Sequence, residues 1–176
     1  PSDTWTYGSG AYYTSYGFNN GTTEMFWGHR YPAETLVDYN NMNLYKVSFY
    51  AVSSGDFDIY VYQGTIDSLP ETLILQQTVT MLSSGWTDVD LSSMIPVDAT
   101  KDLWVFMHDP EARAFPGSCC AYSGDEGNYI SDVDPSTALD TIVGIAFLIR
   151  TFVTDVTYTY NVYNNDARVA ESLNAT

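Results

Sequence analysis

The sequence predicts an all-β protein, folded as an antiparallel jelly-roll β-sandwich. Short runs of β-branched and aromatic residues alternate with polar ones along most of the chain. Turn residues interrupt these runs roughly every 8–12 residues, as in sandwiches. No alternation of strands with helices is visible, which disfavours a parallel sheet. We therefore expect two packed sheets, of which the jelly roll is one arrangement.

The first half of the chain contains four expected strands and one short helix. Residues 11–18 and 23–31 are rich in aromatics. The segment 33–38 follows Pro32 and is the only helix candidate. Residues 44–52 alternate cleanly, and a second alternating run ends at Gly64. The short turn between these two runs predicts that they pair as a hairpin.

The second half continues the pattern. Further strands are expected at 73–81, 86–91 and 129–132. Residues 103–108 are apolar nearly throughout, which is typical of a strand covered on both faces. A long loop is expected over 109–128, because prolines and glycines are frequent there. The run 143–153 is long enough for a helix, but its β-branched residues favour one central strand.

Two segments are expected: a sandwich over 1–154 and a separate piece over 155–176. The second piece reads as a hairpin around Asn164-Asn165-Asp166, and a lone hairpin is marginal in water. We therefore expect it either to pack against the sandwich or to be the first part of a following β module. Because the chain starts without Met, we expect it to be a processed or excised piece.

Composition excludes several classes of partner. The 176 residues include 22 acidic and only 6 basic side chains, for a formal net charge of -16. Such a surface repels nucleic acid and anionic lipid, and it attracts cations such as calcium. No apolar run approaches the ~18 residues of a membrane span. We predict no nucleic-acid partner and no membrane insertion.

Catalytic groups are sparse, so the sequence predicts a protein that is not an enzyme. The two histidines, His29 and His108, are expected to lie half-exposed at strand ends. Asp109 follows His108 directly, and neighbours on a strand point to opposite faces. No Gly-x-Ser-x-Gly motif is present. The pair Asp56 and Asp58 is interpreted as part of a solvated strand face.

The cysteines Cys119 and Cys120 are adjacent. Two packed thiols are the expected state, and a vicinal disulfide that stiffens the loop is the alternative. The acids Asp125, Glu126 and the pair Asp132 and Asp134 lie in or beside the same loop region. They offer the oxygen ligands of a structural calcium site, and a solvated acidic loop is the alternative.

Tyrosines are the candidate binding residues. Exposed aromatic rings stack on sugar faces, and the sequence has 15 Tyr, more than a core of this size requires. We single out Tyr60, Tyr62 and Tyr122 as candidate ligand-binding residues. Packing between strands is the alternative role for such rings.

The ordered motifs of residues 3–153 resemble a secreted β-sandwich module of Bacteroidota surface proteins. The likeness rests on RYPAETLVDYNNMNLYKVSFY at 30–50, Tyr62-Gln63-Gly64, Gly85-Trp86 and Pro116-Gly117. It implies a jelly-roll, galactose-binding-like topology, structural calcium in several members and no catalytic residues in most. Residues 157–173 resemble the opening of the fibronectin-type-III-like repeats in gingipain and hemagglutinin adhesin regions.

Residues and resemblance together predict a non-catalytic adhesion or binding module of a secreted or cell-surface bacterial protein. Its expected partners are a host protein, a glycan or neighbouring domains of the same polypeptide. The alternative is a stabilising accessory or spacer domain of a secreted peptidase or glycosidase.

Overall fold

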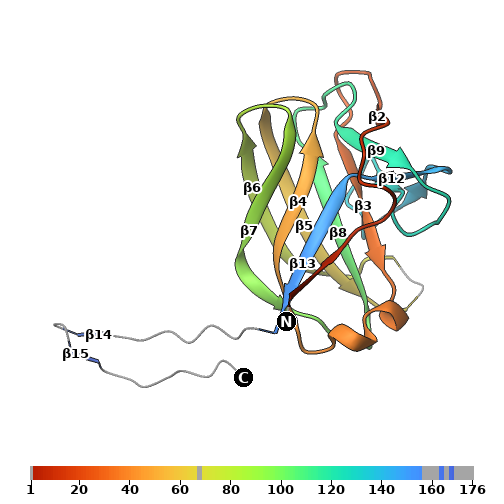
Figure 1. The fold of residues 1–176 in the computed structure, drawn as a ribbon. Helices are drawn as coiled ribbons and strands as arrows, with labels where there is room; N and C mark the ends of the chain where they lie inside the picture. The colour runs from red at the N-terminus through yellow and green to blue at the C-terminus, as the bar shows by residue number, and fades with distance from the viewer. Residues whose placement is uncertain (1, 67–68, 156–162, 165–166, 169–176) are drawn as a thin grey trace.

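The protein is a sandwich of two antiparallel sheets (Figure 1). The computed structural model describes residues 2–66, 69–155, 163–164 and 167–168. The four-stranded sheet has the order β1-β13-β4-β7 and the six-stranded sheet the order β11-β10-β3-β8-β5-β6. The first consists of β1 (Ser2–Trp5), β13 (Ile149–Thr154), β4 (Asn43–Ala51) and β7 (Gly85–Pro96). The second consists of β11 (Asp140–Thr141), β10 (Tyr129–Ser131), β3 (Met25–Tyr31), β8 (Asp102–Asp109), β5 (Gly55–Gly64) and β6 (Thr72–Met81).

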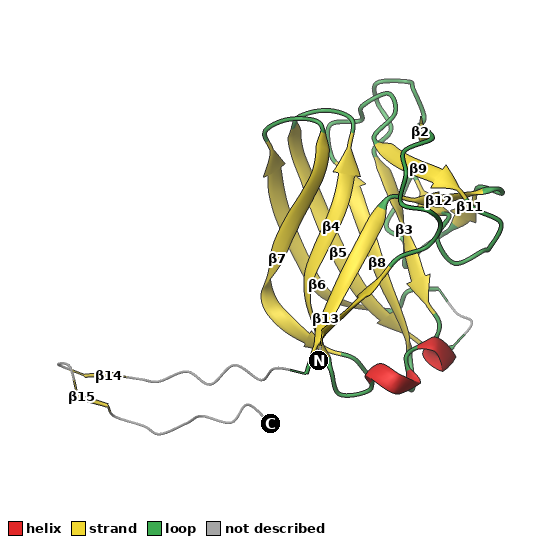
Figure 2. Ribbon diagram, in the orientation of Figure 1, coloured by secondary structure: helices red, strands yellow, loops and turns green. Residues whose placement is uncertain are grey.

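The strand order confirms the predicted jelly roll. Eight strands form it: β1-β13-β4-β7 in one sheet and β3-β8-β5-β6 in the other. Successive strands from β3 to β5 lie in alternate sheets. The hairpin predicted for 44–52 and the run ending at Gly64 was therefore wrong. The short turn after Ala51 carries the chain from one sheet to the other instead of joining two neighbours (Figure 2).

Alternation along the strands builds the core between the sheets. In β4, Val47 and Phe49 are fully buried, and in β5, Phe57 and Ile59 face them from the other sheet. The rings of Phe49 and Phe57 meet at 5.7 Å between centroids. Aromatic pairs at this distance add to the stabilisation that burial alone provides.

The outer face of the six-stranded sheet is also apolar. Every residue of β8 is buried, which confirms the prediction that 103–108 is covered on both faces. Trp104 and Phe106 are stacked on that outer face, and Leu139 from the β10–β11 connection packs against their cluster. The hydroxyl of Tyr62 donates a 3.2 Å hydrogen bond to Asp134 in the same connection. This connection therefore covers part of the sheet.

An insertion separates the last two strands of the jelly roll. It supplies two strands, β12 (Ile145–Phe147) and β9 (Gly117–Ala121), of a third sheet ordered β12-β9-β2. The remaining strand, β2 (Thr14–Tyr16), comes from the segment between β1 and β3. The predicted loop over 109–128 thus contains a strand. The predicted single strand over 143–153 is divided at Leu148 between β12 and β13. The helix candidate is two 3-10 turns, η1 (Ala33–Thr35) and η2 (Val37–Tyr39).

The tail after residue 155 is described in part. Two short strands, β14 (Tyr163–Asn164) and β15 (Ala167–Arg168), pair antiparallel as the predicted hairpin requires. The rest of the predicted hairpin, with the other residues of the segment 157–173, lies outside the described residues. The division at 154 stays a prediction. Among the described residues, no helix has the length and apolar character needed to cross a membrane.

Candidate functional site

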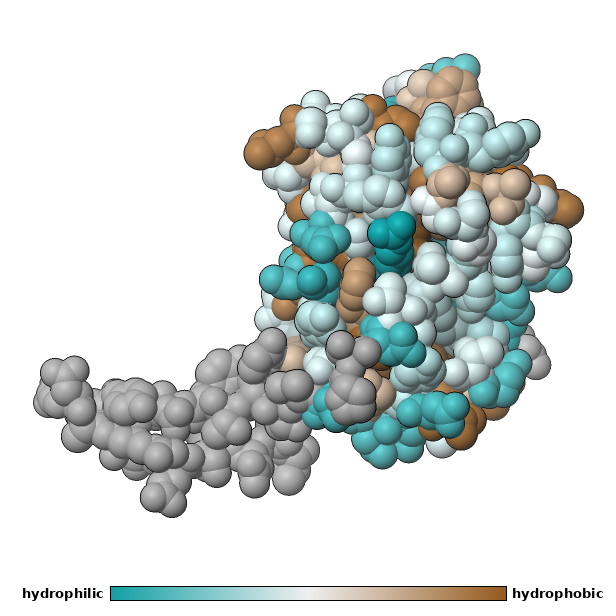
Figure 3. Space-filling model, in the orientation of Figure 1, coloured by the Kyte–Doolittle hydropathy of each residue, from teal (hydrophilic) through white to brown (hydrophobic). Residues whose placement is uncertain are grey.

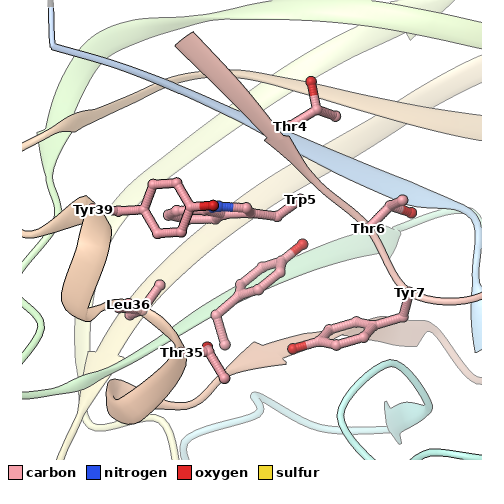
Figure 4. Close-up of a pocket in the computed structure, with 8 residues that line it drawn as sticks. Thr4, Trp5, Thr6, Tyr7, Thr35, Leu36 and Tyr39 are labelled. Atoms are coloured by element: carbon pink, nitrogen blue, oxygen red, sulfur yellow. The ribbon is translucent and has the colours of Figure 1, made fainter. Parts of the chain in front are cut away.

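A pocket of about 270 Å³ opens beside the edge strand β1 (Figure 4). Its walls come from β1 and the segment that follows it, from the end of β3, and from the two 3-10 turns. The lining residues are mostly aromatic or hydroxyl-bearing: Thr4, Trp5, Thr6, Tyr7, Tyr31, Thr35, Leu36 and Tyr39.

Local sequence explains why these elements meet. Strand β1 pairs with β13, and Trp5 lies opposite Thr151 at the point where β1 ends. On the other side, Pro32 cannot donate a ladder hydrogen bond, and β3 ends just before it. The chain then turns through η1 and η2, which brings Tyr39 back over Trp5.

The aromatic rings of the pocket support one another. Tyr7 stacks on Tyr31 with 5.5 Å between ring centroids and 19° between planes. Trp5 lies tilted against Tyr31 at 5.3 Å and edge-on to Tyr39 at 4.8 Å. The hydroxyl of Tyr7 donates a 2.7 Å hydrogen bond to the carbonyl of Arg30. Rings fixed in this way form a wall that needs little reorganisation on binding.

Charge near the pocket is negative. The hydroxyl of Tyr39 donates a 2.5 Å hydrogen bond to Asp3. This hydroxyl, with the backbone N–H of Thr4, holds the pKa of Asp3 below its usual value. Burial raises the pKa of Tyr7 and of Tyr31 well above the usual value, so both hydroxyls stay protonated. No Lys, Arg or His is among the described residues that line the pocket.

A second aromatic surface, formed by Tyr12, Tyr50 and Trp86, lies where β4 ends and β7 begins. Tyr12 stacks on Tyr50 at 5.6 Å, and Tyr50 meets the edge of Trp86 at 6.0 Å. Tyr12 is 51% exposed and also lines a shallow groove with Val52 and Phe115. Figure 3 shows hydrophobic residues in separate small patches at the upper end, at the right edge and at the lower end, around a mostly hydrophilic sheet face.

The structure separates the three tyrosines predicted to bind a ligand. Tyr60 and Tyr62 are stacked at 6.1 Å on the outer face of the six-stranded sheet. Tyr62 is only 2% exposed, so its ring packs in the protein, and Tyr60 is half-buried. Tyr122 lies elsewhere, tilted against Tyr7 at 5.8 Å. The three rings therefore do not form one surface.

The predicted calcium ligands are also kept apart. No group of three or more acidic, histidine or cysteine side chains in the described chain is arranged to hold a metal ion. The backbone carbonyl of Glu126 accepts a 2.7 Å hydrogen bond from the N–H of Arg30. Asp134 instead caps the turn at Ser136 and accepts the Tyr62 hydrogen bond. Asp125 and Asp132 are exposed. The structure therefore gives the predicted cluster no common centre.

The two cysteines are free and buried rather than joined as a vicinal disulfide. Both lie on β9, whose successive side chains point to opposite faces. Cys119 packs into the main core and Cys120 into a small cluster with Ala146 and Leu148. Burial raises the pKa of Cys119 to about 11, so it is a thiol at neutral pH.

The histidines are buried, and the predicted half-exposed state was wrong. His29 lies inside the core, where its Nε2 is 2.8 Å from the carbonyl of Phe147. Burial lowers the pKa of His29 to about 4. His108 lies between two carboxylates, with Nε2 2.9 Å from Glu24 and Nδ1 3.2 Å from Asp58. Asp58 is thus buried beside an imidazole, although we predicted a solvated edge.

Sequence reasoning missed the residues of the pocket. Its rings come from β1, the end of β3 and η2, and no expected strand covered residues 2–5. The one available signal was the run Thr4-Trp5-Thr6-Tyr7, which alternates hydroxyl and aromatic side chains. That pattern is typical of an edge strand with one apolar face.

The fold defines the class: a jelly-roll sandwich with aromatic-lined surfaces, which has counterparts among solved structures. A scan against protein families finds no match, and no curated protein sequence matches. One similar structure holds the cysteine protease and lectin-like domains of Cwp84, a surface layer associated protein of Clostridium difficile. Its TM-score is 0.56 at 13% identity, over 76% of this chain and 32% of that chain.

A second similar structure is the clostridial cysteine protease Cwp84 after propeptide cleavage. It has a TM-score of 0.62 at 13% identity, and the match covers 88% of this chain and 40% of that chain. The first of these structures includes the lectin-like domain of a surface layer associated protein, and the chain spans less than half of either neighbour's length. At 13% identity the likeness establishes a shared fold.

Proposed function

We propose that this chain is a non-catalytic carbohydrate-binding module of a secreted or cell-surface protein, and that the pocket beside β1 is its sugar site. The observation that carries the proposal is the lining of that pocket, which includes four aromatic rings and three threonines. Sugar rings present C–H faces that pack on aromatic rings, and their hydroxyls need hydrogen-bonding partners at the edges.

The size and shape of the site fit this role. A volume of about 270 Å³ accommodates one or two sugar units, and a half-open pocket lets a chain continue outward. The hydroxyls of Thr6 and Thr35 donate to the carbonyls of Ile149 and Pro32, which leaves their oxygens available as acceptors. The lectin-like neighbours share the fold, which supports a binding role for this chain by analogy only.

The experiment is a glycan array followed by calorimetric titration of the best ligand. The variant Thr35→Trp fills the pocket from its exposed rim without removing a buried side chain. We expect it to weaken binding at least about tenfold, since the ligand loses the space it occupies. The matched control is Val37→Trp, because Val37 is 62% exposed in the next 3-10 turn and does not line the pocket. Unchanged binding by Thr35→Trp would place the sugar elsewhere, with the Tyr12 and Trp86 surface as the next candidate.

A second function is supported by the size of the solved neighbours. Those chains include a cysteine protease as well as the lectin-like fold, and this chain corresponds to 32% and 40% of them. By analogy, the sandwich serves as a stabilising accessory domain of a secreted peptidase or glycosidase. This function requires such a domain in the same polypeptide. Flanking coding sequence that contains no peptidase or glycosidase would contradict it.

A further inference from the structure

The pocket beside β1 carries a carboxylate at its wall. Oδ2 of Asp3 accepts the 2.5 Å hydrogen bond of Tyr39, a lining residue, and Oδ1 accepts a 2.7 Å hydrogen bond from the N–H of Thr4, another lining residue. Asp3 is exposed, so its oxygens face solvent as well as these two donors. A carboxylate has about four acceptor positions, and two donors leave it able to bind a further one.

Two more carboxylates flank the pocket. Glu34 precedes the lining residue Thr35, and Asp38 precedes Tyr39; both side chains are exposed. The negative charge of Asp38 acts on the Tyr39 hydroxyl together with that of Asp3. None of the described Lys or Arg side chains lines the pocket, and Arg30, Arg113, Lys46 and Lys101 are each paired with a carboxylate. The field at the pocket is therefore negative, in keeping with the net charge of -16.

The aromatic rings of the pocket also favour a positively charged group. Aromatic faces carry negative potential and attract ammonium groups, and Trp is the most effective of them. Trp5 and Tyr39 stand nearly perpendicular, at 76°, so they present differently oriented surfaces to a bound group. A carboxylate next to aromatic rings is a favourable environment for a protonated amine and an unfavourable one for an anionic sugar.

We infer that the pocket beside β1 selects sugars bearing a protonated amino group, that is, unacetylated hexosamines, over neutral and acidic sugars. This inference rests on the proposed sugar-binding function and names the class of sugar. The pyranose ring packs on Trp5 or Tyr7, and the ammonium group donates to Asp3. Because Tyr39 and Thr4 hold the pKa of Asp3 below its usual value, the carboxylate remains ionised in mildly acidic solution, where the amine is protonated.

The test compares two ligands of equal length by calorimetric titration at pH 6. One is a β-1,4-linked tetramer of glucosamine and the other is the same tetramer fully N-acetylated. Acetylation removes the charge and leaves the pyranose rings in place. We expect the amine form to bind at least about tenfold more tightly, as one charge-assisted hydrogen bond contributes. Asp3→Asn should remove this preference, so that the ratio of the two affinities falls to about one.

The controls separate the site from general attraction to an acidic protein. Asp132→Asn removes one exposed charge in the β10–β11 connection, far along the chain from the pocket, and should preserve the preference. A tetralysine peptide reports binding by charge alone, and it should not distinguish Asp3→Asn from Asp132→Asn. Equal binding of both tetramers would overturn the inference and leave the proposed function intact. A preference that survives in Asp3→Asn would also overturn it. Failure of both tetramers to bind, together with a negative glycan array, would contradict the proposed function itself.

Discussion

Gly28 and Phe106 lie opposite each other on β3 and β8, and the ring of Phe106 occupies the space that a side chain at position 28 would need. A β-carbon on Gly28 would come within 2.5 Å of both a ring carbon of Phe106 and the carbonyl oxygen of Val105. The missing side chain allows Phe106 and Trp104 to stack on the outer face of the sheet.

Gly28→Ala is expected to destabilise the protein by about 1–3 kcal/mol, because overpacking forces rigid neighbours to move. The backbone carbonyl of Val105 cannot rotate away, so the strand itself must shift. Urea unfolding followed by tryptophan fluorescence measures the change. The control is Gly124→Ala, where the three nearest atoms to the added carbon all belong to the partly exposed side chain of Tyr122, which can turn aside without a shift of the backbone. Equal stability of the two variants would contradict the tight packing at Gly28.

The buried ion pair of Arg30 and Asp102 is expected to be essential for the fold. Asp102 is fully buried and accepts hydrogen bonds from Arg30 at 2.9 Å and from the N–H of Ala33 at 2.9 Å. Asp102→Ala leaves the guanidinium without this carboxylate and should cost about 3–5 kcal/mol. Asp98→Ala removes the exposed partner of Lys101 and should cost about 1 kcal/mol or less. Chemical denaturation measures the free energy of unfolding of both variants. Similar decreases would contradict the larger contribution expected of the buried ion pair.

Stability is expected to fall between about pH 6.5 and pH 4, in part because of His29. Burial lowers the pKa of His29 from 6.5 to about 4, so the unfolded chain binds a proton that the folded chain does not. Unfolding is therefore favoured as pH decreases through this window, with a contribution approaching about 3 kcal/mol near pH 4.

The chemical shifts of the His29 ring carbons report its protonation directly. They should remain those of neutral imidazole at pH 5.5. A titration midpoint of His29 above pH 6 would show that its burial in the core is misassigned. The unfolding midpoint in urea should move to lower denaturant over the same pH range.

The two thiols should be inert in the folded protein. Cys119 and Cys120 are both buried, which keeps reagents away from their sulfur atoms. Burial also raises the pKa of Cys119 to about 11, and such a thiol is a poor nucleophile at pH 7.5. A chromogenic disulfide reagent should detect almost no thiol in native protein and two per chain in urea. Intact mass without reductant should match two free thiols. A mass lower by two hydrogen atoms would show that the two cysteines form a vicinal disulfide.

Metal removal should leave the protein unchanged. The acids predicted as calcium ligands do not converge in the described chain, and Asp134 is engaged with Tyr62 and Ser136. A cation bound to the native state would raise the melting temperature. We therefore expect treatment with EDTA, and then with calcium, to shift the melting temperature by less than about 1 °C, which is what weak binding at the surface would produce. A larger, saturable rise with calcium would mean that other oxygens hold the ion.

The sequence predicted the strands more accurately than their partners. Alternation and apolar runs are local signals, so residues 103–108 were recognised as a strand buried on both faces. Which sheet a strand joins depends on distant pairings, and the short turn after Ala51 gave no sign that it crosses between sheets. The strand at 117–121 was missed because prolines and glycines around it resemble a loop. Its burial comes from pairing with β12 and β2.

The candidate site was not predictable either, because it too depends on contacts between segments that are distant in the sequence. Tyr62 has the composition of a binding residue, yet the β10–β11 connection covers it. The pocket depends on Trp5 and Tyr39, which are 34 positions apart and meet only when β1 is paired and η2 has turned back. Side-chain type suggests what a residue can do, but its exposure is decided by segments far away in the chain.

The pairing of Ser2 with Thr154 has a consequence for how the protein is made. The ribosome synthesises β1 first and its neighbour β13 last among the jelly-roll strands, so one edge of the sandwich cannot form while the chain is still being elongated. Until then β4 lacks one of its two neighbours and offers an open edge to other chains. Contacts between such distant positions also slow folding. A nascent chain arrested before residue 149 should therefore be the species that aggregates or recruits chaperones.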